Sequence, residues 1–330
     1  MHVKSMTQAL GLMLAAVTLQ AHPALAADLS TQYPNKPIRF IMPYPVGGSI
    51  DLSGRVIAQQ LGDNLGQQIV VDNRTGAGGT LGTEQAAHAA PDGYTIVMGG
   101  TGTLAISPGL GRKLGYDPLT DFAPVTLLAT TPYVLVVHPS VPANSVRELI
   151  ALAKSQPGKL IYASGGSGSA PHLIGEIFRA KAGVNVLHVP YKGSTPAKID
   201  LMGARVQMFF TGIPSVSSEL RAGTLRAIGV TSAKRAPALP ELATIAESGV
   251  PGFDVSPWFG MLAPARTPQS LVGRLNHEIL KVLQTPSIRD RLVRDGVEPV
   301  GNTPQEFAVF IRSEMKKWAQ AVKDSGAKVE

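Results

Sequence analysis

The sequence predicts an α/β protein of two lobes, each a mostly parallel sheet covered by helices. β-branched runs alternate with stretches of helical period along most of the chain. A weak internal repeat places a strand, a glycine-hydroxyl turn and a helix start in each half. Two segments could carry the chain from one lobe to the other and back, which predicts a hinge of two strands.

The N-terminal residues predict a signal peptide over residues 1–26. Lys4 gives a positive start, an apolar run covers residues 9–19, and Ala24-Leu25-Ala26 is the small-x-small pattern that signal peptidase reads. The apolar run is too short to span a bilayer, which takes roughly 20 residues. We therefore expect export to the periplasm and cleavage near Ala26, with an uncleaved membrane anchor as the alternative.

Composition excludes several classes of function. The chain has no cysteine, which excludes disulfides, thiolate metal sites and a cysteine nucleophile. Its net charge is +7, but the basic residues are scattered and aromatic residues make up only 5% of the chain. Because nucleic-acid binders cluster basic charge and interleave aromatics, we expect no nucleic-acid partner.

The expected elements follow in chain order. The predicted strands cover residues 38–42, 69–71, 95–98, 134–137, 160–163, 184–189, 206–210 and 225–230, and predicted helices include 49–65, 146–153 and 171–182. The C-terminal third is expected to be helical. There, Thr267-Pro268 and Thr303-Pro304 each place a capping hydroxyl before a proline at the first helical position.

Two segments are candidates for the crossovers between lobes, residues 121–129 and residues 249–258. If both cross, one lobe is discontinuous and consists of residues 27–127 and 253–330. The other lobe is then the insert 128–252.

Three turns follow predicted strands and combine glycines with hydroxyl side chains: residues 43–51, 164–172 and 191–196. Ligands of open α/β sheets bind beyond the carboxyl ends of strands. Free amides at a helix start favour an anion, and glycine lets the ligand approach them. We expect Ser49, Ser169 or Ala170, and Thr195 to cap the helices that follow. Lys192 is the only cation in these turns.

A glycine-rich turn alone carries little weight, because such turns occur throughout α/β proteins. Three of them on an exported chain favour a binding cleft that needs no cofactor. The Walker loop and the nucleophile elbow are absent, no two histidines stand at metal-ligand spacing, and residues 76–79 are interpreted as a turn. The enzymatic alternative is a periplasmic hydrolase that uses Ser49 or Ser167 with His172.

Four side chains near these turns have open roles. His172 either touches a ligand or caps and packs, and Asp51 either receives a ligand amine or favours its own helix start. Trp258 either forms a wall of the cleft or packs at the hinge. Tyr44 is the aromatic residue most expected to lie against a ligand.

Seven spaced motifs run along the chain: Tyr33-Pro34-x-Lys36-Pro37-Ile38-Arg39, Pro43-Tyr44-Pro45-x-Gly47-Gly48-x-x-Asp51, Asn73-Arg74-x-Gly76-Ala77-Gly78-Gly79, Ala90-Pro91-Asp92-Gly93-Tyr94, Tyr116-Asp117-Pro118, His188-Val189-Pro190-Tyr191-Lys192-Gly193 and Thr231-Ser232-Ala233-Lys234-Arg235. These motifs resemble those of the Bug family, the extracytoplasmic receptors of tripartite tricarboxylate transporters. They stand in the family's order along essentially the whole mature chain.

The resemblance implies a two-lobed periplasmic binding protein of type II that closes over a carboxylate and is not an enzyme. It implies membrane subunits of a transporter as partners, or a sensing role without transport, and a monomer. Carried over, the ligand-binding residues are Tyr44, Pro45, Gly47, Gly48, Ser49, Asp51, Thr101, Thr103, Ser164, Gly165, Gly166, Ser167, Gly168, Ser169, His172, Tyr191, Lys192, Ser194 and Thr211. Thr211 stands where many relatives carry Asp, which favours a di- or tricarboxylate or an aromatic acid over an amino acid.

Overall fold

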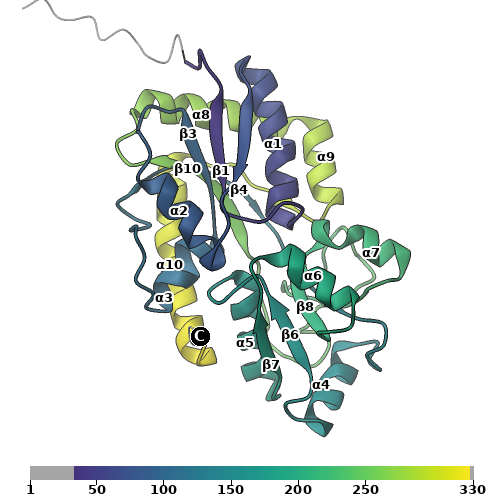
Figure 1. Ribbon diagram of the computed structural model, residues 1–330. Coiled ribbons are helices and arrows are strands. Elements are labelled where there is room, and N and C mark those ends of the chain that lie inside the picture. Colours follow the sequence, from purple (N-terminus) through teal and green to yellow (C-terminus); the bar gives the residue numbers. More distant parts are fainter. Residues whose placement is uncertain (1–32, 328–330) are drawn as a thin grey trace, which may run out of the picture.

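The computed structural model describes residues 33–327, so the predicted signal peptide lies outside the described residues. The chain forms two β-sheets, one in the upper and one in the lower half of Figure 1, with helices on the faces of both. No helix within the described range is both long and apolar enough to cross a membrane.

The first sheet has the strand order β11-β4-β10-β3-β1-β2. Its strands are β1 (Ile38–Met42), β2 (Ile69–Asn73), β3 (Thr95–Gly100), β4 (Phe122–Thr130), β10 (Trp258–Pro264) and β11 (Glu298–Pro299). β1 is parallel to β2 and β3, whereas β10 pairs antiparallel with β3 and β4, and β11 pairs antiparallel with β4.

Both faces of this sheet are covered by helices. Successive side chains of a strand point to opposite faces. On β1, Phe40 packs in one core with α1 (Ser49–Leu65) and α8 (Gln269–Gln284), and Ile41 packs in another with α10 (Pro304–Ser325). The remaining helices of this lobe are α2 (Thr80–Ala87), α3 (Ser107–Gly109) and α9 (Pro286–Arg294), with short turns η1 (Ala77–Gly79) and η2 (Gly102–Ile106).

The second sheet has the order β7-β6-β8-β5-β9. Its strands are β5 (Tyr133–Val137), β6 (Ile161–Ser164), β7 (Leu187–Pro190), β8 (Met208–Gly212) and β9 (Arg226–Val230), and its helical elements are α4 (Val146–Ser155), α5 (Ala170–Ala182), α6 (Ser194–Met202), η3 (Ile213–Ser215) and α7 (Ser217–Ala222). β6 is parallel to β7 and β8, while β5 is antiparallel to β8 and β9.

The two sheets are joined by two chain segments that lie side by side. One leads from β4 to β5 and the other from β9 to β10. The amide of Thr131 donates to the carbonyl of Pro257 at 2.8 Å, and the amide of Thr231 donates to the carbonyl of Tyr133 at 2.9 Å. The predicted two-strand hinge is therefore present.

The eight strands predicted from the sequence are all found, with ends that shift by up to three residues. The α/β class is confirmed, but the sheets are mixed rather than mostly parallel. The difference arises at the crossovers, where β4 and β10 continue as long antiparallel strands of the first sheet. β4 extends to Thr130, and the predicted lobe limits at residues 127/128 and 252/253 stay a prediction.

Of the two helix caps predicted in the C-terminal third, one is confirmed and one is wrong. Thr303 caps α10 in a reciprocal capping box with Glu306, as expected. The prediction for Thr267 is wrong, since α8 begins at Gln269 after an N-cap at Pro268 and the hydroxyl of Thr267 donates to the carbonyl of Pro264.

Candidate functional site

A cavity of about 310 Å³ lies between the two sheets. The first lobe lines it with Pro43, Tyr44, Pro45, Gly48, Ser49, Ile50, residues 75–79, Thr101, Gly102, Arg112, Pro257 and Trp258, and the second with Tyr133, residues 165–167, residues 169–171 and residues 190–194. Most of these residues follow the carboxyl ends of β1, β2, β3, β6 and β7, where α/β sheets bind their ligands.

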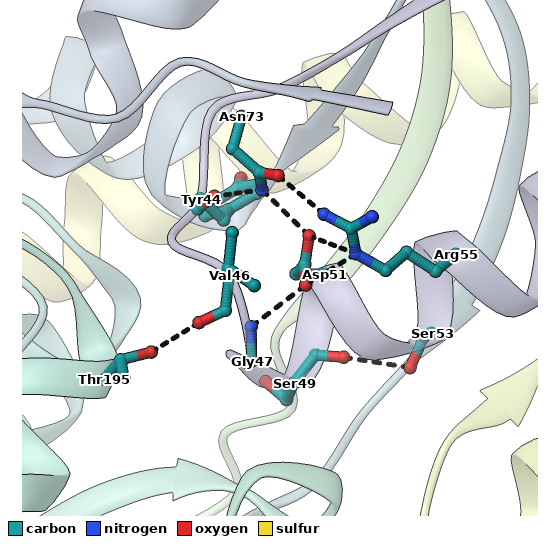
Figure 2. Close-up of polar contacts among 9 residues, drawn as sticks. All are labelled: Tyr44, Val46, Gly47, Ser49, Asp51, Ser53, Arg55, Asn73 and Thr195. Atoms are coloured by element: carbon teal, nitrogen blue, oxygen red, sulfur yellow. Dashed lines mark hydrogen bonds and ion pairs between the residues drawn. The ribbon is translucent and has the colours of Figure 1, made fainter. Parts of the chain in front are cut away.

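The loop between β1 and α1 is held from behind by Asp51 (Figure 2). The buried Asp51 carboxylate accepts hydrogen bonds from the Gly47 amide at 3.0 Å, from Asn73 Nδ2 at 2.8 Å and from Arg55 Nε at 3.0 Å. Asn73 Nδ2 also donates to the carbonyl of Tyr44 at 2.8 Å. Asp51 does not line the cavity. Of the two roles suggested for Asp51, the structure agrees with stabilising the start of its own helix, because Asp51 lies in the first turn of α1.

Three helices begin at the cavity without a side-chain cap. The N-cap residues are Gly48 for α1, Ser169 for α5 and Gly193 for α6, and none makes a side-chain capping hydrogen bond. The predicted caps Ser49 and Thr195 are wrong, because both lie inside the first turn. Ser169 is the N-cap residue of α5, but its Oγ is buried without a hydrogen-bond partner in the structure. First-turn amides left in this state attract anions.

The second glycine-rich loop, residues 164–169, is held from behind by two histidines. The Gly168 amide donates to His172 Nδ1 at 3.2 Å. The Gly166 amide donates to Ser164 Oγ, which lies 2.7 Å from His188 Nε2. Burial, together with the neighbouring His172, lowers the pKa of His188 to about 3. His172 thus supports the loop and does not line the cavity, which removes it from the position that a hydrolase would require.

Glycine allows the loops of the two lobes to meet. Gly78 has φ +71°, and a Cβ atom built on it would lie 3.0 Å from the carbonyl oxygen of Ser167 across the cleft. Gly166 has φ +118°, and its Cβ would lie 3.5 Å from the amide nitrogen of Gly78 across the cleft and 3.1 Å from the carbonyl oxygen of Tyr191 within its own lobe. Sequence reasoning interpreted residues 76–79 as an ordinary turn, yet three glycines in four residues after a strand repeat the composition of the predicted binding turns.

The charged side chains that line the cavity are all positive. Among its lining residues none is acidic, and Arg112 and Lys192 are cationic. Arg112 was missed by sequence reasoning because it follows α3 and belongs to none of the glycine-rich turns. Such a wall favours an anion, and three tyrosines, Tyr44, Tyr133 and Tyr191, also line it.

Tyr44 and Tyr133 both keep their protons at neutral pH. Burial raises the pKa of Tyr44 well above its usual range, and burial raises the pKa of Tyr133 to about 12 against an opposing hydrogen bond with Ser49. Both hydroxyls can therefore donate. Trp258 lines the cavity and is also packed, with 1% of its surface exposed, so both suggested roles hold.

The predicted site residues fall into two sets. Those that line the cavity are Tyr44, Pro45, Gly48, Ser49, Thr101, Gly165, Gly166, Ser167, Ser169, Tyr191, Lys192 and Ser194. Those outside the lining are Gly47, Asp51, Thr103, Ser164, Gly168, His172 and Thr211. Several of the second set form hydrogen bonds behind the wall, as Thr211 does with Ser215 at 2.8 Å.

Two α/β lobes on a two-strand hinge, with strand-end loops facing a shared cavity, define a two-lobed solute-binding receptor. The sequence matches the family described as tripartite tricarboxylate transporter family receptor over residues 54–327. The chain belongs to this family, and it is a receptor rather than an enzyme.

Individual relatives agree with this assignment. BugT of Bordetella pertussis is 38% identical over 312 residues, which is 94% of this chain and 96% of BugT. The solved periplasmic binding protein BugD superposes with a TM-score of 0.86 at 35% identity, over 90% of this chain and 100% of BugD. A protein of R. palustris solved with adipate superposes with a TM-score of 0.88 at 37% identity, over 90% of this chain and 100% of that protein.

Proposed function

We propose that this receptor captures a small carboxylate, a di- or tricarboxylate or an aromatic acid, in the cleft between its lobes. The observation that carries the proposal is the convergence of three uncapped helix starts, α1, α5 and α6, on one cavity without an acidic lining residue. Ser169, whose hydroxyl is buried without a hydrogen-bond partner in the structure, lines the same cavity. The family's name and the adipate in a structural neighbour support the same chemistry.

Backbone donors are sufficient for such a ligand. An anion at a helix start gains about 0.3–1 kcal/mol, up to ~2 kcal/mol when partly buried. Each hydrogen bond to a charged group adds roughly 1.5–3 kcal/mol. Two or three converging helix starts thus supply the roughly 8 kcal/mol that corresponds to micromolar affinity.

The proposed contacts come from the lining residues, and the set behind the wall positions the loops. The mature receptor, after removal of residues 1–26, acts in the periplasm. There it delivers its ligand to the membrane subunits of a tripartite tricarboxylate transporter. The receptor acts as a monomer. Its lobes are residues 27–127 with 253–330, and residues 128–252, a division that the membership of the two sheets supports.

A thermal-shift screen of carboxylates, amino acids and aromatic acids tests this function. A bound ligand stabilises the native state, so at least one carboxylate should raise the melting temperature. Gly48→Val should abolish that shift. Gly48 has φ −73°, which a valine tolerates, while the new side chain covers the start of α1. The proposal fails if no carboxylate stabilises the wild type, or if Gly48→Val responds like the wild type.

A further inference from the structure

Two side-chain hydrogen bonds join loops of opposite lobes over the cleft. Thr195 Oγ1, in α6, donates to the carbonyl of Val46 at 2.8 Å (Figure 2). Arg112 Nη1 donates to the carbonyl of Ser167 at 2.9 Å and to the carbonyl of Ala77 at 3.2 Å. Arg112 and Ala77 lie on the side of the first sheet, and Ser167 lies on the side of the second. The bond to Ser167 therefore requires that the lobes are together.

Arg112 differs from Thr195 in that its side chain also lines the cavity. It forms no ion pair with any residue of the described part of the chain. Its hydrogen bonds to the described residues use Nη1 only, and both acceptors are neutral carbonyl oxygens. The guanidinium has five N–H donors, so those of Nε and Nη2 remain for another acceptor.

We propose that Arg112 is a specificity-determining residue that receives the second carboxylate of a dianionic ligand. This rests on the proposed function, in which one carboxylate lies at the uncapped helix starts. The planar guanidinium matches a carboxylate in a paired geometry, which a point charge such as Lys192 cannot reproduce. Because the same side chain bonds Ser167, recognition of the second carboxylate is coupled to closure of the lobes.

Titration calorimetry with two acids of equal chain length, adipate and hexanoate, tests the assignment. In Arg112→Gln the affinity for adipate should fall by about 10-fold to 100-fold, the size of a lost hydrogen-bonded charge, while the affinity for hexanoate changes by less than about threefold. Thr195→Val is the matched control, since it removes the other cross-cleft bond without changing charge. It should weaken both acids by the same factor.

Equal losses for the two acids in Arg112→Gln would reduce Arg112 to a closure contact and overturn the specificity assignment, as would an unchanged affinity for adipate. A wild type that prefers hexanoate to adipate also contradicts the assignment while leaving carboxylate capture intact. If the screen identifies another dicarboxylate, that acid and its monocarboxylate analogue replace the pair. A wild type that binds no carboxylate contradicts the proposed function itself.

Folding is controlled by melting each variant without ligand. Arg112→Gln should melt within a few degrees of the wild type, because the Arg112 side chain is only partly buried. If it does not, Arg112→Lys keeps the charge and removes the paired geometry. In Arg112→Lys the affinity for adipate should then fall more than the affinity for hexanoate, by a smaller factor than in Arg112→Gln. Equal losses of affinity for the two acids in that variant would reject the assignment.

Discussion

Single residues decide how closely the two lobes approach each other. The contact between Gly78 and the loop at Ser167 leaves no room for a side chain, since a Cβ on Gly78 would lie 3.0 Å from a backbone oxygen. Gly78 also has positive φ, which L-residues adopt at a cost. Gly66 offers a comparison, because it has φ +66° and nothing within 4 Å of its Cβ position.

Gly78→Ala should lower both stability and ligand affinity, whereas Gly66→Ala should lower stability alone. Each substitution places an alanine at positive φ and should cost about 1 kcal/mol of unfolding free energy. Only the alanine at residue 78 also obstructs closure across the cleft. Urea unfolding and calorimetry on both variants measure the two effects. Equal affinities in Gly66→Ala and Gly78→Ala would show that the lobes need not meet there.

His188 should make the fold sensitive to acid. Its pKa in the folded protein is about 3, below the ordinary value of 6.5, so between these values the unfolded chain binds more protons than the folded one. The free energy of unfolding therefore falls as the pH is lowered from about 6.5 toward 3. In His188→Gln the decline should be shallower over this window when both proteins are unfolded in urea. Identical pH slopes would mean that His188 is not held neutral.

Among the elements, α10 connects the first sheet to the rest of the molecule. It packs against β4 and against α5 of the second lobe, and it lies on the left side of Figure 1, coloured yellow. Glu314 in its middle is buried and accepts from the indole Nε1 of Trp258 at 2.8 Å and of Trp318 at 2.7 Å. The carboxylate thus satisfies two buried donors from different elements.

Glu314→Leu should destabilise the fold by about 2 kcal/mol or more, because it leaves two buried indole N–H groups without acceptors. Glu314→Gln keeps one carbonyl oxygen and should lose less. Chemical denaturation measures the difference, and ligand affinity should stay unchanged in both variants. A leucine variant as stable as the glutamine variant would show that the two indole bonds contribute nothing.

At this scale the sequence predicts what is local. The strands at 38–42 and 160–163 and the helix at 49–65 are found because each carries its own hydrophobic period and its own turn. β4 was interpreted as a crossover and β10 was not predicted, since both strands contain prolines and pair with strands more than 100 residues away. No local pattern encodes such a pairing.

The same limit applies to the site. The turns at residues 43–51 and 164–172 follow strands and can be predicted from their glycine and hydroxyl residues. Arg112 and the contact at Gly78 come to the cavity only through the apposition of the lobes. The helix caps at Ser49 and Thr195 were predicted wrongly because a hydroxyl one or two residues after the N-cap has the same local pattern as a cap.

For the whole molecule, the central claim is that backbone amides from two lobes, joined by one hinge, together hold a carboxylate. The two halves of the cavity lie on different sheets, so neither lobe alone presents the full set of donors. Closure is held by Thr195 on one side and Arg112 on another.

A crystal structure of the receptor with a carboxylate from the thermal-shift screen tests this claim most directly. We expect carboxylate oxygens within hydrogen-bonding distance of first-turn amides of α1 and of α5 or α6, in one cavity. A ligand bound outside the cleft, or held by side chains of a single lobe with these amides left free, would contradict it.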